Sequence, residues 1–60
     1  MKYYLIEKAT DNMLKAVTNS KIPKEGEKLT LGNLFYRVEQ VKEIASIFGV
    51  IYNVYLEEIK

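Results

Sequence analysis

The sequence contains neither cysteine nor histidine among its 60 residues. Without cysteine the chain forms no disulfide and no thiolate metal site. Without histidine it lacks the side chain that proteins use most often as a general base and as a metal ligand. A metal ion would have to be held by carboxylates and carbonyls, and the sequence has no loop in which Asp and Glu cluster for that purpose. We therefore expect no metal and no cofactor.

Long apolar runs are also missing. No run approaches the roughly 20 residues that a membrane-spanning helix requires. The first residues, MKYYLIE, show neither the long apolar segment nor the small-residue cleavage site of a signal peptide. The net charge of +1 favours neither nucleic acid nor an anionic membrane as a partner. We expect a cytoplasmic protein that does not bind membranes.

Residues suited to catalysis are few and poorly placed. The serines and threonines have no histidine to activate them. Glu57 and Glu58 are adjacent, so on a strand they point to opposite faces and cannot act as a carboxylate pair. The three glycines stand singly at positions 26, 32 and 49 and form no phosphate-binding loop. We therefore expect that the protein is not an enzyme.

The sequence does contain enough apolar residues for one small core. They make up 48% of the chain. A domain of about 60 residues buries only about 60% of the surface that its unfolded chain exposes, so it is near the lower size limit for independent folding. We expect a single domain over residues 1–60.

Strand and turn signals alternate along the chain, beginning with a hairpin. Residues 2–9 are rich in aromatic and β-branched types and predict a first strand. Thr10, Asp11 and Asn12 are typical of a turn, and residues 13–20 predict a second strand that returns antiparallel to the first. Pro23 cannot donate a hydrogen bond to a neighbouring strand, so the second strand ends before it.

The second half of the chain predicts further strands. Leu29 and Leu31 alternate with polar residues in a short third strand, and Gly32-Asn33 suits a tight turn into a fourth. Residues 50–58 alternate most clearly and predict a fifth strand. Its core-facing residues are expected to be Val50, Tyr52, Val54 and Leu56.

Residues 34–48 fit two different structures. Apolar residues recur there at helical spacing, and Asn33 and Gly49 are suited to begin and end a helix. The segment opens with strand-forming residues, however, and the spacing of its first apolar residues also fits a strand with one bulge. We favour a strand over residues 34–42. The alternative is an α+β fold, with a helix over about 34–48 packed on an antiparallel sheet.

After the predicted hairpin come the motif I-P-x-x-G-E-x-L-x-L-G at residues 22–32, Y-x-V-x-x-V at residues 36–41 and a closing V-Y-L-E-E-I at residues 54–59. This order resembles small SH3-like β-barrels found in short proteins of phage and mobile-element origin in Gram-positive bacteria, whose function is mostly undefined. The resemblance implies an all-β, five-stranded antiparallel barrel and a phage accessory protein, and it includes no site motif. The segment KEIASIFG departs from it, since such barrels usually have a polar turn there. The matching positions are Ile22, Pro23, Gly26, Glu27, Leu29, Leu31, Gly32, Tyr36, Val38, Val41, Val54, Tyr55 and Leu56.

The first and fifth predicted strands are apolar on both faces, so one face of each is left outside the core. A contiguous apolar patch on a protein surface usually marks a contact with a partner. We therefore predict a non-catalytic protein-interaction module that forms a homodimer or docks on a larger partner. If Tyr4 and Ile6 line the core, the predicted interface consists of Tyr3, Leu5, Phe35, Ile47, Phe48, Ile51 and Tyr55.

The alternative function is a small barrel that binds nucleic acid. Four lysines and a single aspartate lie between positions 8 and 24. Barrels of this kind stack bases on surface aromatic rings and place lysines along the phosphates. The candidate contacts are Tyr4, Lys8, Lys15, Lys21 and Lys24.

Overall fold

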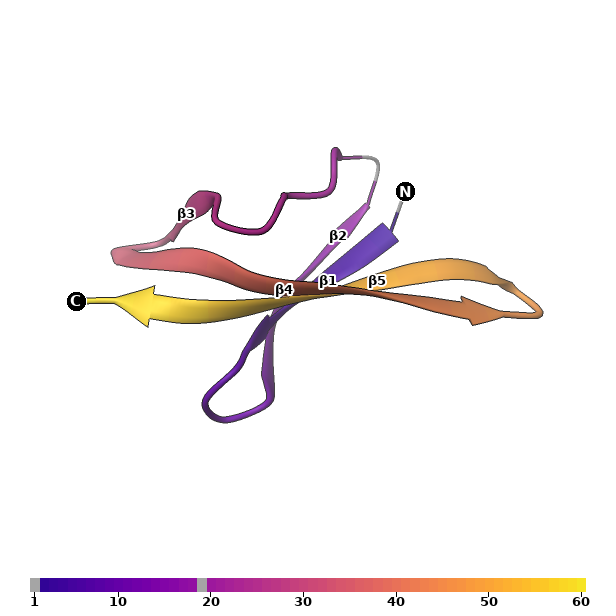
Figure 1. Cartoon of the computed structure of the whole chain (residues 1–60), viewed down its shortest axis with the longest axis horizontal. Helices are drawn as coiled ribbons and strands as arrows, with labels where there is room; N and C mark the ends of the chain where they lie inside the picture. The colour runs from indigo at the N-terminus through magenta and orange to yellow at the C-terminus, as the bar shows by residue number, and fades with distance from the viewer. Residues whose placement is uncertain (1, 19) are drawn as a thin grey trace.

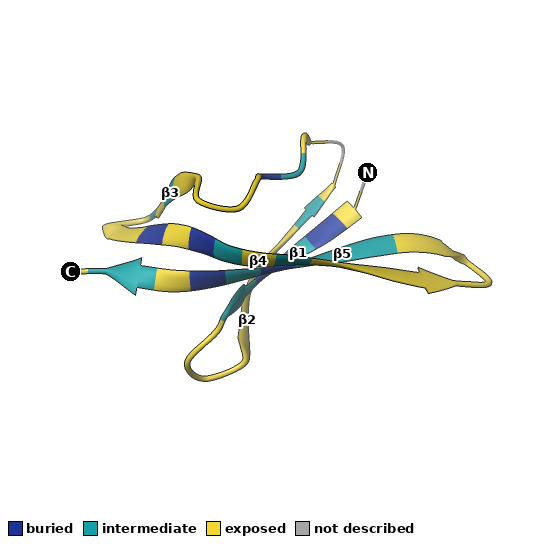
Figure 2. Ribbon diagram, viewed as in Figure 1, coloured by how far each residue is buried: buried dark blue, intermediate teal, exposed yellow. Residues whose placement is uncertain are grey.

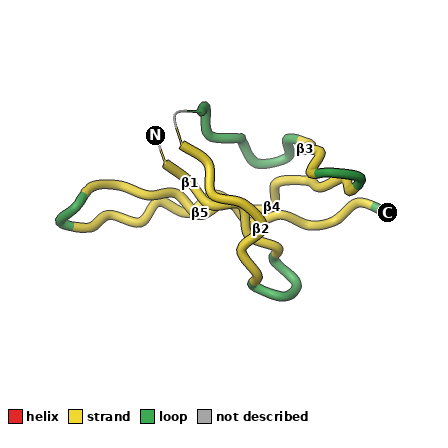
Figure 3. The backbone as a smooth tube through the Cα atoms, turned by 180° about the vertical axis from the view of Figure 1, so that it is seen from behind, coloured by secondary structure: helices red, strands yellow, loops and turns green. Residues whose placement is uncertain are grey.

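The computed structural model describes residues 2–18 and 20–60, and these form five strands and no helix. These residues therefore include no helix long and apolar enough to cross a membrane. Figure 1 shows the strands in one twisted layer, and Figure 3 shows the same layer from behind. The strands are β1 (Lys2–Glu7), β2 (Asn12–Thr18), β3 (Lys28–Leu31), β4 (Leu34–Ser46) and β5 (Gly49–Ile59).

The strands form one mixed sheet in the order β2-β1-β5-β4-β3. Three neighbouring pairs are antiparallel, but β1 and β5 run parallel. The all-β prediction is confirmed, and the prediction that every strand is antiparallel is wrong. Turn residues specify the direction of strands joined by a hairpin. They say nothing about β1 and β5, whose relative direction depends on how the segment between β2 and β3 crosses the sheet.

The core lies on the concave side of the sheet. Val54 and Leu56 of β5 are completely buried, as predicted for this face of the strand, but Val50 is 47% exposed, so the prediction that it lines the core is wrong. Tyr3 and Leu5 of β1 are only 6% and 4% exposed, so the prediction that they face outward is wrong. In the parallel register Tyr3 lies beside Tyr52 and Leu5 beside Val54, which puts them on the core face. A shift of one residue would have reversed the two faces of β1.

Residues 34–46 form a single long strand, so the helical alternative is wrong. The predicted bulge is confirmed, because Val38 pairs with Leu56 and Gln40 with Tyr55, leaving Glu39 unpaired. The extra residue keeps Val38 and Val41 on the core side of the sheet. β4 does not end at residue 42 as predicted, and the segment expected to be a connection pairs with β5 as far as Ser46.

The segment between β2 and β3 closes over the concave side of the sheet. Pro23 is buried, and Ile22 packs against the core. The segment then joins the edge of β4, where the Gly26 N–H donates to the Val38 carbonyl and the Val38 N–H donates to the Glu27 carbonyl, both at 2.8 Å. Figure 2 shows the buried residues gathered where this segment and the crossing strands meet. A core of six buried side chains results: Tyr3, Leu5, Tyr36, Val38, Val54 and Leu56.

The sheet is curled but open, like half of a barrel. In the described chain, β2 and β3 form its two edges and do not contact each other. The molecule measures 39 × 21 × 18 Å, and its accessible surface is 4460 Å². A compact protein of this mass would expose about 4000 Å². The closed, SH3-like barrel is not confirmed, and the chain leaves more surface uncovered than its size requires.

Candidate protein-interaction surface

The β4–β5 hairpin extends beyond the rest of the sheet. Among the described residues, β1 pairs with β5 no further than Ile51, and the hydrogen bonds of the segment beside β4 end at Val38. The end of the hairpin, residues 44–51, therefore projects at the right of Figure 1, and we call it the arm. Figure 2 shows that most of the arm is exposed. Beyond the Lys2–Ile51 pair, no other described strand lies beside the arm.

The arm consists of apolar and uncharged residues. It contains no charged side chain, and the nearest charges are those of Lys42 and Glu43. Ile47 and Phe48 form its tip, and each is 93% exposed. Ile44 and Val50 behind them are about half exposed. Hairpin tips in water are usually polar and contain Gly, Asn, Asp or Ser. An apolar tip exposed to this degree points to a contact surface.

The geometry of the turn does not explain why its tip is apolar. The Ser46 hydroxyl donates to the Gly49 carbonyl and accepts from the Phe48 N–H, both at 3.1 Å. Gly49 takes the positive φ of 126°, which β-carbon-bearing residues avoid. Ile47 and Phe48 keep negative φ, so any common residue would fit their positions. Serine and glycine order the turn, and isoleucine and phenylalanine are available for binding.

The arm also has a free backbone edge. No described residue pairs with the side of β4 away from β5 beyond Val38. Residue pairs in an antiparallel hairpin alternate between those bonded to each other and those whose backbone groups point away. Ser46 and Gly49 close a two-residue turn as a bonded pair. The N–H and C=O groups of Glu43 and Ala45 therefore point to the free edge, where a further strand can bond to them.

The convex face of the sheet is a second apolar surface, but charged side chains cover part of it. Tyr4 and Tyr55 lie on this face and are half-buried. The ammonium groups of Lys2 and Lys42 lie 5.6 Å from the ring centroids of Tyr4 and Tyr55, respectively. An ammonium group over an aromatic ring is attracted by the face of the ring and covers part of it. The tyrosine rings of the convex face are therefore better covered than the apolar side chains of the arm, which makes the arm the stronger candidate for a partner contact.

One end of the convex face holds a small charge network. The Arg37 guanidinium is 3.1 Å from a Glu39 carboxylate oxygen and 3.8 Å from one of Glu57. The pKa of Glu39 lies below its ordinary value because its carboxylate shares a hydrogen bond with the Glu57 carboxyl and another with Arg37. These groups are solvent-accessible, so they contribute little to stability. Arg37 contacts both carboxylates, and the remaining negative charge is exposed to solvent, so the network needs no partner.

The predicted interface residues fall into three groups in the structure. Tyr3 and Leu5 belong to the core. Phe35 and Tyr55 lie on the convex face, and Phe35 is well exposed. The remaining three, Ile47, Phe48 and Ile51, come together on the arm. Sequence reasoning did not assign Ile44 to the interface and placed Val50 in the core, whereas both lie on the arm; the uncharged run from 44 to 56 was the signal that could have found them.

The candidate nucleic-acid contacts do not gather on one face. Lys15 pairs with Leu5, so it points to the concave side, whereas Tyr4 points to the convex side. Lys8 lies in the β1–β2 turn, and Lys21 follows the far end of β2. A strand of this length separates the two by roughly 20 Å. Lys24 lies in the crossing segment. The common Lys/Tyr face that the alternative function needs is not formed by these five residues.

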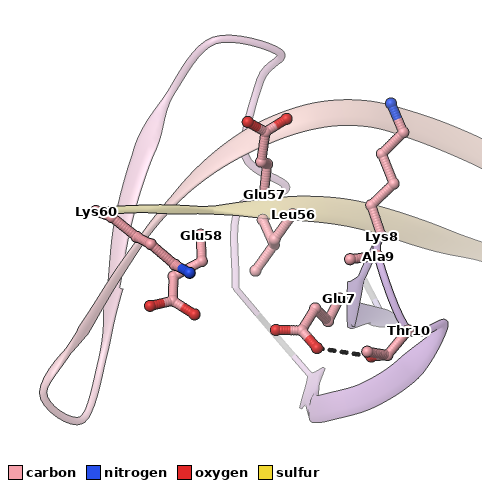
Figure 4. A pocket seen from close by; sticks show the side chains of 8 residues that line it. All are labelled: Glu7, Lys8, Ala9, Thr10, Leu56, Glu57, Glu58 and Lys60. Atoms are coloured by element: carbon pink, nitrogen blue, oxygen red, sulfur yellow. Dashed lines mark hydrogen bonds between the residues drawn. The ribbon is translucent and has the colours of Figure 1, made fainter.

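A shallow pocket lies between the β1–β2 turn and the C-terminal end of β5 (Figure 4). Glu57 and Glu58 point to opposite sides of β5 there, as expected from their adjacency. The Glu7 carboxylate accepts a 2.6 Å hydrogen bond from the Thr10 hydroxyl, which orders the turn. Within residues 2–18 and 20–60 no group of His, Cys, Asp and Glu could hold a metal ion. The lining residues are Glu7, Lys8, Ala9, Thr10, Leu56, Glu57, Glu58 and Lys60.

Tyr36 gives the fold a predictable response to alkaline pH. Burial raises the pKa of its hydroxyl, and the carboxylates of Glu7 and Glu58 raise it further. The folded state therefore keeps a proton that the unfolded chain loses near pH 10. The stability from this group is complete below pH 10 and is lost as the pH rises through the folded pKa. Urea unfolding from pH 9 to 11 should show a smaller loss of stability in Tyr36→Phe than in the wild type. Equal losses would contradict this assignment.

Comparison with known proteins places the chain in no family: no protein-family model matches it, and neither the curated proteins nor the solved structures contain a significant match.

Proposed function

We propose that the chain is a non-catalytic protein-interaction module that binds a second copy of itself through the arm. The observation that carries this proposal is the tip, where Ile47 and Phe48 are 93% exposed although the turn does not need them. Burying one such side chain contributes about 1.5–3 kcal/mol. In a symmetric dimer both copies bury their tips, so the gain is counted twice.

A protein partner suits the arm better than a lipid membrane does. The backbone groups of Glu43 and Ala45 point to a free edge. Inside lipid an unpaired backbone group costs several kcal/mol, because nothing there bonds to it. Another strand satisfies these groups and covers the apolar side chains at the same time. A second copy supplies such a strand, since an antiparallel edge can pair with itself.

The test is the solution mass of the wild-type protein as a function of concentration, measured by sedimentation equilibrium. We expect the average mass to rise from that of one chain towards that of two as the concentration increases from micromolar to millimolar. A mass of one chain across this range would overturn the proposal. Moderate salt should not dissociate the dimer, because the contact is apolar rather than ionic.

Three further expectations from the sequence remain predictions. Docking on a larger partner, a phage accessory role and a cytoplasmic location each await evidence of their own. The nucleic-acid alternative also remains a prediction, with no specific feature of the described residues in its favour. A titration of labelled single-stranded DNA at low salt tests it directly, because phosphate contacts are strongest there.

A further inference from the structure

The geometry of the arm points to one way in which two copies meet, and this inference rests on the proposed function. We infer that the free β4 edges of two copies pair antiparallel around a two-fold axis, with Ile44 of one copy opposite Ile44 of the other. The two sheets then form one continuous sheet. The free edge available for this runs over residues 39–46.

Symmetry limits the number of registers. In an antiparallel pair of identical strands, a two-fold axis perpendicular to the sheet passes between a residue and its own copy. Each register is therefore named by the residue at the axis. Residues directly opposite each other share one face of the sheet and pack together, so the side chains at the axis meet their own copies.

Registers centred on Lys42 or Glu43 are excluded for two reasons. Centring on Lys42 puts two ammonium groups opposite each other, and centring on Glu43 puts two carboxylates opposite each other. Like charges in these positions are destabilising. Both registers also place the tip of one copy against a part of the second copy's β4 edge that is already paired. With Glu43 at the axis, Phe48 meets Val38 of the second copy, whose backbone is already bonded to residues 26 and 27. Centring on Lys42 moves the tip still further into that occupied edge.

The register centred on Ile44 gives the longest overlap that avoids these conflicts. Centres closer to the turn shorten the paired segment. With Ile44 at the axis, the edge-facing backbone groups of Glu43 bond to those of Ala45 of the second copy, and the reverse pair forms by symmetry. Each bonded pair in an antiparallel sheet exchanges two backbone hydrogen bonds, so the two pairs together supply four.

The same register covers the apolar tip. Ile47 comes to lie opposite Val41 of the second copy, and Phe48 opposite Gln40. Lys42 faces the uncharged Ser46 of the second copy, so this register places no two charged side chains opposite each other. The tip ends where the second copy's residues 26 and 27 begin to occupy the edge. The free edge of one molecule is therefore long enough to hold the hairpin end of the other.

The chain has no cysteine, so a single introduced cysteine is its only thiol and tests this register directly. In the Ile44→Cys variant, the two thiols face each other across the axis. The Cα atoms of such a pair are about 4.5–5.5 Å apart, which suits a disulfide. The matched control is Gln40→Cys, on the same strand and the same convex face. Its two copies would lie roughly 27 Å apart, at about 3.4 Å per residue.

Under mild oxidation we expect most of the Ile44→Cys protein to become a covalent dimer that a reducing agent reverses, and little of the Gln40→Cys protein to do so. Equal cross-linking of the two variants, alongside a wild-type protein that is dimeric by sedimentation, would overturn the register and leave the proposed function intact. A wild-type protein that stays monomeric would overturn both. Circular dichroism of each variant checks that it retains the β-sheet.

Discussion

Replacing Tyr3 by alanine should lower the free energy of unfolding by about 3–5 kcal/mol, the usual loss for a buried aromatic ring. The same change at Tyr4 should lower it by about 1 kcal/mol or less, as is common for surface positions. Tyr3 is 6% exposed and belongs to the core, whereas Tyr4 lies on the convex face beneath Lys2. The two residues are adjacent and identical, so each variant serves as the control for the other.

The expected difference is large compared with the stability of the domain. Single domains are typically stable by only about 5–15 kcal/mol, and one of this size lies near the lower limit. We therefore expect Tyr3→Ala to be largely unfolded at 25 °C and Tyr4→Ala to remain folded. Urea unfolding followed by far-ultraviolet circular dichroism measures both. If Tyr4→Ala were the more destabilised variant, the assigned register of β1 against β5 would be wrong.

The ambiguity of β1 explains why its faces could not be assigned from the sequence. Both faces of β1 are apolar, with Tyr3 and Leu5 on one and Tyr4 and Ile6 on the other. Alternation gives the spacing of the two faces but not which of them is buried. That choice depends on the register between β1 and β5, which are separated by the whole length of the domain. β5 was assigned correctly because polar residues interrupt its convex face at Asn53 and Glu57.

The fate of residues 34–48 shows how pairing overrides local preference. Glu39, Gln40 and Lys42 favour a helix by intrinsic propensity. They lie in a strand because β5 pairs with β4 along nearly its whole length. Propensity is worth only a fraction of a kcal/mol per residue, whereas an unpaired β5 would expose both apolar side chains and backbone groups. The bulge at Glu39 was predictable, since only an extra residue brings Val38 and Val41 to the same face.

The candidate site was partly predictable for a similar reason. Ile47 and Phe48 stood out because the resemblance to small barrels calls for a polar turn at their position. Ile44 was missed because it was expected to lie in a connection or a helix, and Val50 because it was expected to face the core from the fifth strand. The projection of the arm depends on where β1 and the segment beside β4 end. No local pattern in the sequence encodes those two end points.

Replacing both tip residues, in the double variant Ile47→Ser and Phe48→Ser, should weaken self-association by roughly ten-thousandfold or more. Each of the two tips loses about 3 kcal/mol or more of apolar burial in the dimer, and every 1.4 kcal/mol changes the dissociation constant tenfold. The unfolding free energy of the monomer should barely change, because both side chains are almost fully exposed in it. Ser46 and Gly49, which order the turn, are left in place.

The matched control is Phe35→Ser, which removes an exposed phenylalanine from the convex face at the opposite end of β4. Sedimentation equilibrium of the three proteins at the same concentrations separates the two apolar surfaces. If the tip variant is monomeric and Phe35→Ser remains dimeric, the arm is the contact surface. If Phe35→Ser dissociates and the tip variant does not, the convex face makes the contact, and the exposed tip then has no part in self-association. The arm is favoured because lysine ammonium groups already lie over two tyrosine rings of the convex face, whereas nothing in the described chain covers Ile47 and Phe48.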